Sequence, residues 1–158
     1  SKTAGLPQMK LSWIVIRGPK SFRESARTRL ELISDTFLSV QTGIQEALGS
    51  ILELVPNVQS QILERVRKNL ATLNSAVINT SADCLRAEGG WNAVVRIPRT
   101  LSEEEWATTL LEEANVLVHP GYFYDFPQEG FLVVSLLPRP EDFNLALERM
   151  LSLIAGRT

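Results

Sequence analysis

The sequence predicts an α+β fold, with helices packed on a small sheet, preceded by a strand and a series of long helices. Three observations lead to this prediction. Apolar residues recur every three or four positions over most of residues 39–79, which is typical of amphipathic helices. Two runs containing β-branched residues, 91–97 and 131–137, are bounded by Gly and Pro and predict strands. Helical patterns beginning at Ser102 and Pro140 follow these runs.

The first half of the chain predicts one strand and three helices. Ser21 and Glu24 have the spacing of a capping box at the start of the first helix. Pro56 is expected to end the second helix, because proline lacks the N–H that a helix interior needs. The predicted elements are a strand at 10–16 and helices at 21–33, 39–55 and 57–79.

The second half predicts three strands and two helices. Ser102 offers a capping hydroxyl, and the glutamates after it complement the helix dipole. The apolar face of that helix is expected to contain Trp106, Leu110, Leu111 and Ala114. Pro140 begins the last helix and Gly156 ends it. The predicted strands are 91–97, 116–118 and 131–137.

Composition and charge exclude several classes of protein. Of the 158 residues, 44% are apolar and 22% are charged, as in ordinary globular proteins. The net charge of -2 gives no reason to expect a nucleic-acid or membrane partner. Cys84 is the only cysteine and His119 the only histidine, so neither a disulfide within the chain nor a metal site is expected. With no apolar run long enough to span a membrane and no visible signal peptide, we expect a cytoplasmic protein.

A dense motif surrounds Lys2. Ser1-Lys2 is followed, in register, by Gly5, Pro7, the basic Lys10 and the pair Ser12-Trp13. This pattern resembles the signature around the Schiff-base lysine of class I/II (fold-type I) aminotransferases, which depend on pyridoxal 5'-phosphate (PLP). The resemblance implies that Lys2 forms the internal aldimine with PLP and moves protons at the substrate's α-carbon. It also implies that Lys10, where the family usually has Arg, binds the cofactor phosphate.

The resemblance extends over almost the whole chain. Residues 30–48 resemble the family's passage into its interdomain helices, and 90–98 resemble the first strand of its small domain. It therefore implies that 1–20 end the large PLP-binding domain, 21–81 form interdomain helices, and 82–158 form the small C-terminal domain. We expect the chain to be the C-terminal portion of a longer enzyme and to be inactive alone. The full-length form is expected to be a homodimer whose upstream part supplies most of the cofactor pocket.

Two features concern the substrate. Many family members have, near the position of Val133, an Arg that binds the substrate's carboxylate. Its absence here leaves three explanations open: another residue holds the carboxylate, the substrate differs, or the activity has drifted. His119, Tyr122, Tyr124 and Asp125 cluster around a Pro-Gly turn. Tyr122 and Tyr124 are candidate substrate residues if this loop lines the pocket, and the alternative is a surface turn.

The resemblance implies an aminotransferase that moves an amino group between an amino acid and a 2-oxo acid. Two alternatives remain open. One is a PLP-dependent carbon–sulfur lyase, which shares the lysine motif. The other is not an enzyme but an aminotransferase-like sensor domain of a transcription regulator.

Overall fold

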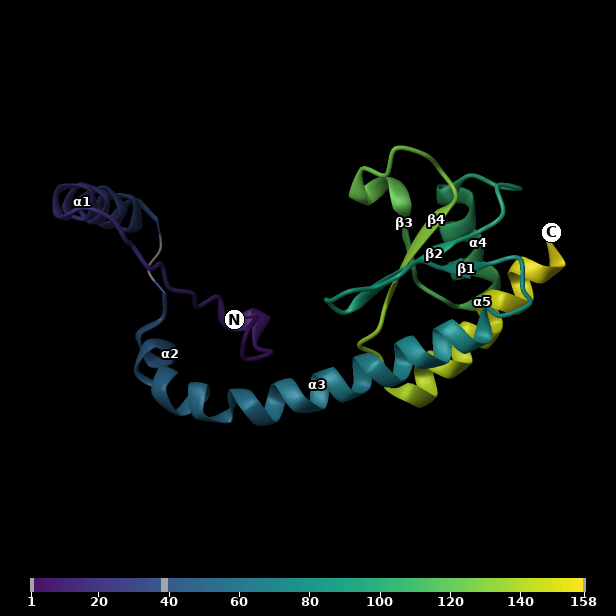
Figure 1. Ribbon diagram of the computed structural model, residues 1–158, viewed down its shortest axis with the longest axis horizontal. Helices are drawn as coiled ribbons and strands as arrows, with labels where there is room; N and C mark the ends of the chain where they lie inside the picture. Colours follow the sequence, from purple (N-terminus) through teal and green to yellow (C-terminus); the bar gives the residue numbers. More distant parts are fainter. Residues whose placement is uncertain (1, 38–39, 158) are drawn as a thin grey trace. The chain divides into compact units, whose positions relative to one another are not determined.

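The computed structural model describes residues 2–37 and 40–157, and the chain divides into two compact units, Ser1–Ser60 and Gln61–Thr158 (Figure 1). The predicted boundaries after residues 20 and 81 remain predictions. Helix α3 begins in the first unit and ends in the second. The elements up to α3 are η1 (Pro7–Met9), α1 (Lys20–Thr36), α2 (Thr42–Glu46) and α3 (Leu48–Ala76). The later elements are β1 (Asp83–Cys84), β2 (Asn92–Arg96), α4 (Glu103–Ala114), β3 (His119–Pro120), η2 (Gly121–Tyr124), β4 (Phe131–Ser135) and α5 (Pro140–Gly156).

The second unit is built on an antiparallel sheet with the strand order β1-β2-β4-β3, as the α+β prediction requires. In the central pair, Ala93 lies opposite Val134 and Val94 lies opposite Val133. Because directly opposite residues point to the same side, the sheet has two distinct faces. Ala93 and Val134 belong to the hydrophobic core. Val94 and Val133 lie on the other face.

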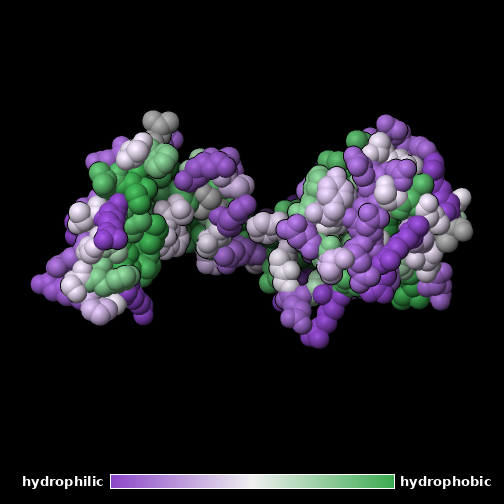
Figure 2. All heavy atoms as spheres, turned by 90° about the horizontal axis from the view of Figure 1, so that it is seen from above, coloured by the Kyte–Doolittle hydropathy of each residue, from purple (hydrophilic) through white to green (hydrophobic). Residues whose placement is uncertain are grey.

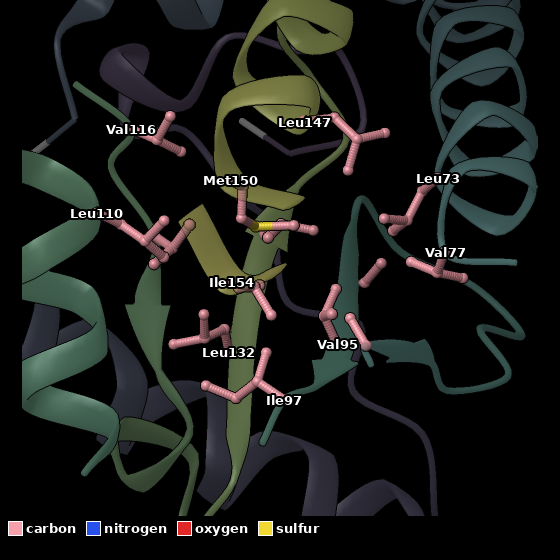
Figure 3. Close-up of a cluster of buried hydrophobic side chains, with 14 of the residues drawn as sticks. Leu73, Val77, Val95, Ile97, Leu110, Val116, Leu132, Leu147, Met150 and Ile154 are labelled. Carbon is pink, nitrogen blue, oxygen red and sulfur yellow. The ribbon is translucent and has the colours of Figure 1, made fainter. Parts of the chain in front are cut away.

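The core of this unit gathers side chains from the sheet and from α3, α4 and α5 (Figure 3). Met150 and Ile154 of α5, Leu110 of α4 and Leu132 of β4 are among its fully buried members. Burying one such side chain stabilises a fold by about 1.5–3 kcal/mol. The predicted apolar face of α4 is confirmed at Trp106 and Leu110, but Leu111 is 46% exposed and does not belong to it.

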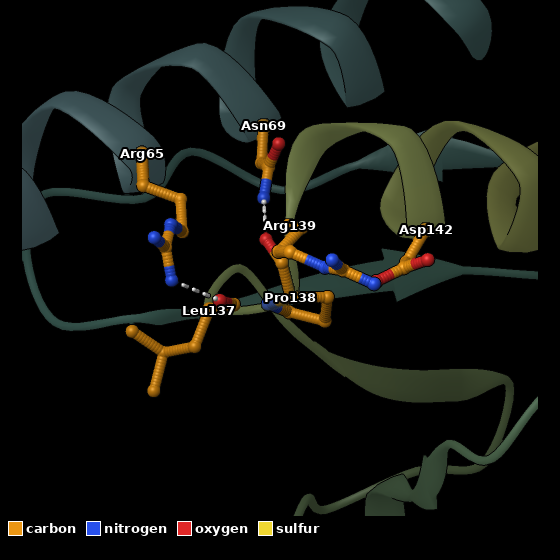
Figure 4. Close-up of polar contacts among 6 residues, drawn as sticks. All are labelled: Arg65, Asn69, Leu137, Pro138, Arg139 and Asp142. Carbon is orange, nitrogen blue, oxygen red and sulfur yellow. Dashed lines mark hydrogen bonds and ion pairs between the residues drawn. The ribbon is translucent and has the colours of Figure 1, made fainter.

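A polar contact joins α3 to the segment between β4 and α5 (Figure 4). The side chain of Asn69 is fully buried, and its amide donates to the carbonyls of Leu136 (3.0 Å) and Pro138 (2.9 Å). Arg65 donates to the carbonyl of Leu137 at 3.4 Å. These bonds satisfy carbonyls that lie past the end of the strand and have no sheet partner there.

The predicted strand at 10–16 is not present in this fully described stretch. Strand backbone needs a partner for its hydrogen bonds, and the described part of the first unit contains no strand. Trp13, Ile14 and Val15 are accordingly more than half exposed, in contrast to the buried strand that was expected. These apolar residues would form a buried strand only if a sheet from outside this chain paired with them.

Two helix boundaries also differ from the prediction. Pro56 lies inside α3 and does not end a helix. The lost hydrogen bond and ring clash cost about 3 kcal/mol, and apolar positions such as Val55 and Val66, which are buried on either side, favour one continuous helix. Helix α1 begins after Pro19 with no side-chain cap, so the expected capping box of Ser21 and Glu24 is wrong. The predicted helix start at Ser39 lies outside the described residues.

The strand assignments in the second unit are confirmed at 92–96 and 131–135 and shifted elsewhere. The short strand predicted at 116–118 lies at His119–Pro120, because Asn115 ends α4 in a left-handed conformation and Val116 N–H donates to Leu110 O. β1 was not predicted. Its residue Cys84 packs against the core, and burial, followed by the charge of Asp83, raises the pKa of this thiol.

Candidate functional site

The backbone around Lys2 and Lys10 consists of two successive turns. The N–H of Gly5 donates to the carbonyl of Lys2 at 3.1 Å, and Gly5 has a positive φ of 65° that favours glycine. The 3-10 helix η1 follows, with Met9 N–H donating to Leu6 O, and ends at Lys10 in a left-handed conformation. The amide of Gln59 on α3 donates to Thr3 O at 3.2 Å and holds the first turn.

The two turns bring Lys2 and Lys10 to one hollow of about 540 Å³. Thr3 and Ser12 add hydroxyl groups to its wall. Both lysine residues are exposed. The sequence motif therefore places its two candidate cofactor residues at one site, whereas Ser1 lies outside the described residues.

The donors at this hollow fit a phosphate-bearing aldehyde such as PLP. A primary amine is the group that condenses with an aldehyde, and a second ammonium neutralises a phosphate as a point charge. Lys2 and Lys10 carry groups of these two kinds, and Thr3 and Ser12 are hydroxyl-bearing residues of the same lining. Among the described residues that line the hollow there is no carboxylate to pair with a pyridine nitrogen.

Val133, at the position expected for a carboxylate-binding Arg, lies in the middle of β4. It is 5% exposed and is paired with Val94 on one side and His119 on the other. No fixed positive charge therefore stands at this point of the sheet. Arg139, further along the chain, forms an ion pair with Asp142 at the start of α5.

The candidate substrate residues Tyr122 and Tyr124 lie in the segment 121–130, here called the aromatic loop. Their side chains are 49% and 44% exposed. The Tyr124 hydroxyl lies 2.9 Å from Nδ1 of His119, so the structure brings these two predicted residues together. Tyr122 packs edge-on against Phe123 with ring centroids 4.9 Å apart. Asp125 ends η2 in a left-handed conformation.

Glu103 is a polar residue of this region whose position the sequence did not reveal. Although it stands at the start of α4 beside two exposed glutamates, it is 3% exposed. Its carboxylate accepts hydrogen bonds from the backbone of Tyr122 and Phe131. The sequence offered no signal that distinguishes Glu103 from Glu104, because the partners lie far along the chain.

A metal-binding cluster and a membrane-spanning helix are both absent from the part of the chain that the structure describes. Within residues 2–37 and 40–157, no group of three or more His, Cys, Asp or Glu residues is arranged to hold a metal ion. In the same ranges, no helix combines the length and the apolar character that a membrane crossing requires.

Comparison with known proteins gives related sequences but no matching family model. The LL-diaminopimelate aminotransferase of Chlamydia pneumoniae is 27% identical over 163 residues, and that of Lawsonia intracellularis is 28% identical over 165 residues. Each match covers 95% of this chain, and the chain spans 38% of the length of each relative.

Solved structures agree in fold. A PLP-dependent aminotransferase from Streptococcus suis matches with a TM-score of 0.79 at 18% identity, over 99% of this chain and 40% of that one. The aspartate aminotransferase of Thermotoga maritima matches with a TM-score of 0.65 at 17% identity, over 83% of this chain and 33% of that one. The chain thus has the fold of part of these aminotransferases, and its sequence is similar to 38% of the length of each LL-diaminopimelate aminotransferase.

Proposed function

We propose that the complete protein is a PLP-dependent aminotransferase that moves an amino group between an amino acid and a 2-oxo acid, and that Lys2 and Lys10 hold the cofactor. The observation that carries this proposal is the shared hollow of Lys2 and Lys10 in a chain with an aminotransferase fold. When bound, PLP supplies an aldehyde that condenses with amines and an electron-withdrawing ring that stabilises negative charge.

In this proposal the two lysines have different roles. Lys2 Nζ would hold the cofactor covalently and, once the substrate amine displaces it, would carry the proton that leaves and returns at the substrate's α-carbon. Lys10 neutralises the phosphate, and its flexible ammonium does so without the bidentate geometry of an Arg. Gly5 and the Gln59 bond to Thr3 fix the turn that carries Lys2.

The substrate is assigned only as far as amino acid and 2-oxo acid. The names of the two relatives make LL-diaminopimelate the first donor to assay. Tyr122 and Tyr124 are proposed to contact the substrate, which is supported by their exposed side chains on the aromatic loop. The family resemblance also supports a homodimer in the cytoplasm.

The decisive experiment uses the complete protein with PLP and measures 2-oxo-acid-dependent amino transfer together with the visible absorbance of the bound cofactor. The unaltered protein should show both. Lys2→Ala should lose both, whereas Lys20→Ala, which removes an exposed lysine paired with Glu24, should retain both. Release of pyruvate from a cysteine conjugate without amino transfer would instead identify a carbon–sulfur lyase. Absence of both activities would contradict the proposal.

A further inference from the structure

The two ends of the aromatic loop are held by one side chain. Oε2 of Glu103 accepts a hydrogen bond from the Tyr122 N–H at 2.7 Å, and Oε1 accepts one from the Phe131 N–H at 2.8 Å. Tyr122 lies near the start of the loop, and Phe131 is the first residue of β4. The carboxylate therefore bridges the entry and the exit of the loop.

Because Glu103 is buried, only a carboxylate at this position can accept both hydrogen bonds. At 3% exposure, the Glu103 carboxylate is shielded from bulk water, so its oxygens need hydrogen bonds from the protein. Two backbone N–H donors and the N-terminal end of α4, where Glu103 is the first helical residue, supply positive polarity. A neutral glutamine in this position would keep one acceptor oxygen and turn a donor NH₂ toward the other N–H.

Gly121, in the loop, lies directly against the Glu103 carboxylate. A Cβ atom at this position would lie 2.8 Å from Glu103 Oε1 and 2.9 Å from Cβ of Phe131. Cβ of Phe131 is fixed to a strand and cannot move aside easily. Gly121 is thus required for the close approach of the loop to the carboxylate.

The aromatic side chains depend on this anchored backbone. Phe126 packs on Phe131 with ring centroids 5.1 Å apart, and the Tyr124 hydroxyl meets His119. Tyr122, which carries one of the anchored amides, and Phe123 and Tyr124, which follow it, remain exposed. A loop released at Tyr122 would lose the fixed direction of these three rings.

We propose that Glu103 is a positioning residue, which fixes the aromatic loop so that Tyr122 and Tyr124 are presented to the substrate. The kinetic consequence rests on the proposed function, whereas the effect on the loop backbone does not. Glu103 itself is buried and acts on the substrate only through the loop.

The test compares Glu103→Gln with Glu104→Gln in the complete protein. Both changes remove one charge from the first turn of α4, but Glu104 is exposed. Hydrogen exchange of the Tyr122 and Phe131 amides should become about tenfold faster or more in Glu103→Gln, as expected for loss of a charge-assisted hydrogen bond, and stay unchanged in Glu104→Gln. Equal exchange in the two variants would overturn the proposal.

Steady-state kinetics separate positioning from a loss of folded protein. A smaller folded fraction lowers the apparent kcat and leaves KM unchanged. Displacement of the loop should instead raise KM for the amino donor by about tenfold. Gly121→Ala, which leaves the carboxylate in place but forces the loop away, should raise KM in the same way. An unchanged KM in both variants would overturn the positioning role.

A measurement on the unaltered protein covers the case in which Glu103→Gln does not fold. The Tyr122 and Phe131 amides should then exchange more slowly than those of Gln128 and Glu129, which lie in the exposed part of the loop. Comparable rates at all four amides would overturn the proposal. Absence of amino transfer in the unaltered protein would contradict the proposed function alone, since the exchange rates still decide the role of Glu103.

Discussion

Lys10 combines an unusual backbone with the side chain proposed to bind phosphate. Its φ of 53° lies in the left-handed region, which costs a non-glycine residue on the order of 1 kcal/mol. Glycine would relieve this cost but would offer no charge. A long cation at this left-handed turn, on the same hollow as Lys2, is consistent with the proposed role.

Replacement of Lys10 tests this role directly. Lys10→Ala should weaken PLP binding by about tenfold, because one charge-assisted contact to phosphate is lost. Lys10→Arg should bind at least as well as the unaltered protein, since a guanidinium also neutralises phosphate. The measurement is a titration of the complete protein followed by visible absorbance, with Lys20→Ala as the control. An unchanged Kd in Lys10→Ala would remove this residue from the site.

Residues of the site differed in how far the sequence could predict them. Lys2 and Lys10 remain predicted cofactor residues, and they line one hollow because the motif is local and spans two adjacent turns. Glu103 was missed because its partners lie 19 and 28 residues away. A single sequence does not show which of three consecutive glutamates meets such partners. The closeness of residues within one local motif could therefore be predicted, whereas the burial of Glu103 could not.

At the scale of elements, α4 was predicted from its N-terminal residues. The Ser102 hydroxyl accepts from the backbone of Glu105, and the Ser102 N–H donates to the Glu105 carboxylate at 2.8 Å. The backbone bond from Ser102, followed by its hydroxyl, lowers the pKa of Glu105 below the ordinary value of 4.5. A complete capping box like this one has a clear sequence pattern.

This pKa shift predicts how stability depends on pH. Because the folded pKa is lowered, the contribution of Glu105 is present above pH 4.5 and is lost as the pH falls through the folded pKa. The midpoint of thermal unfolding should therefore be higher for the unaltered protein than for Glu105→Gln at pH 7. This difference should narrow as the pH falls below 4.5. A difference that stays constant over this range would show that the capping box does not depend on the charge.

Asn69 links α3 to the segment after β4, and its replacement should destabilise the second unit. Asn69→Ala leaves the carbonyls of Leu136 and Pro138 without a donor and should cost about 2 kcal/mol. Asn69→Asp should cost more at pH 7, because a carboxylate would face two carbonyl oxygens. Urea unfolding measures both, with Asn74→Ala on the exposed side of α3 as the control. Equal stability of Asn69→Ala and Asn74→Ala would contradict this account.

The elements predicted wrongly from the sequence depend on interactions with residues outside the local segment. Residues 10–16 have the composition of a buried strand, but a strand forms only where another strand completes its hydrogen bonds. Pro56 is a reliable local signal for a helix end, and here the apolar stripe on either side outweighs it. Both errors concern interactions that local propensity does not contain.

At the scale of the whole molecule, the two units differ in how they bury apolar residues. The second unit has a continuous core, whereas α1 in the first unit has no buried residue. Figure 2 shows apolar residues gathered on the surface of the first unit. The exposed large apolar side chains there include Trp13, Ile14, Val15, Phe22, Leu32, Ile33 and Phe37.

Stability should therefore be unequal along the isolated 158-residue chain. We expect trypsin to cut first at basic residues of α1, such as Arg23 and Arg29, and later within the second unit, because α1 opens without disrupting a core. Mass spectrometry of brief digests measures the order of cleavage. The same digestion in denaturant, where all sites are open, is the control. Simultaneous cleavage in both units would contradict this expectation.

The rate at which a reagent labels Cys84 can be used to follow the opening of the sheet at β1. It is the only thiol in the chain, and its pKa is raised by burial at the core side of β1. A thiol reagent near neutral pH should therefore react slowly with the native chain and rapidly after denaturation. The native labelling rate then reports how often this edge of the second unit separates from the core, without any engineered probe.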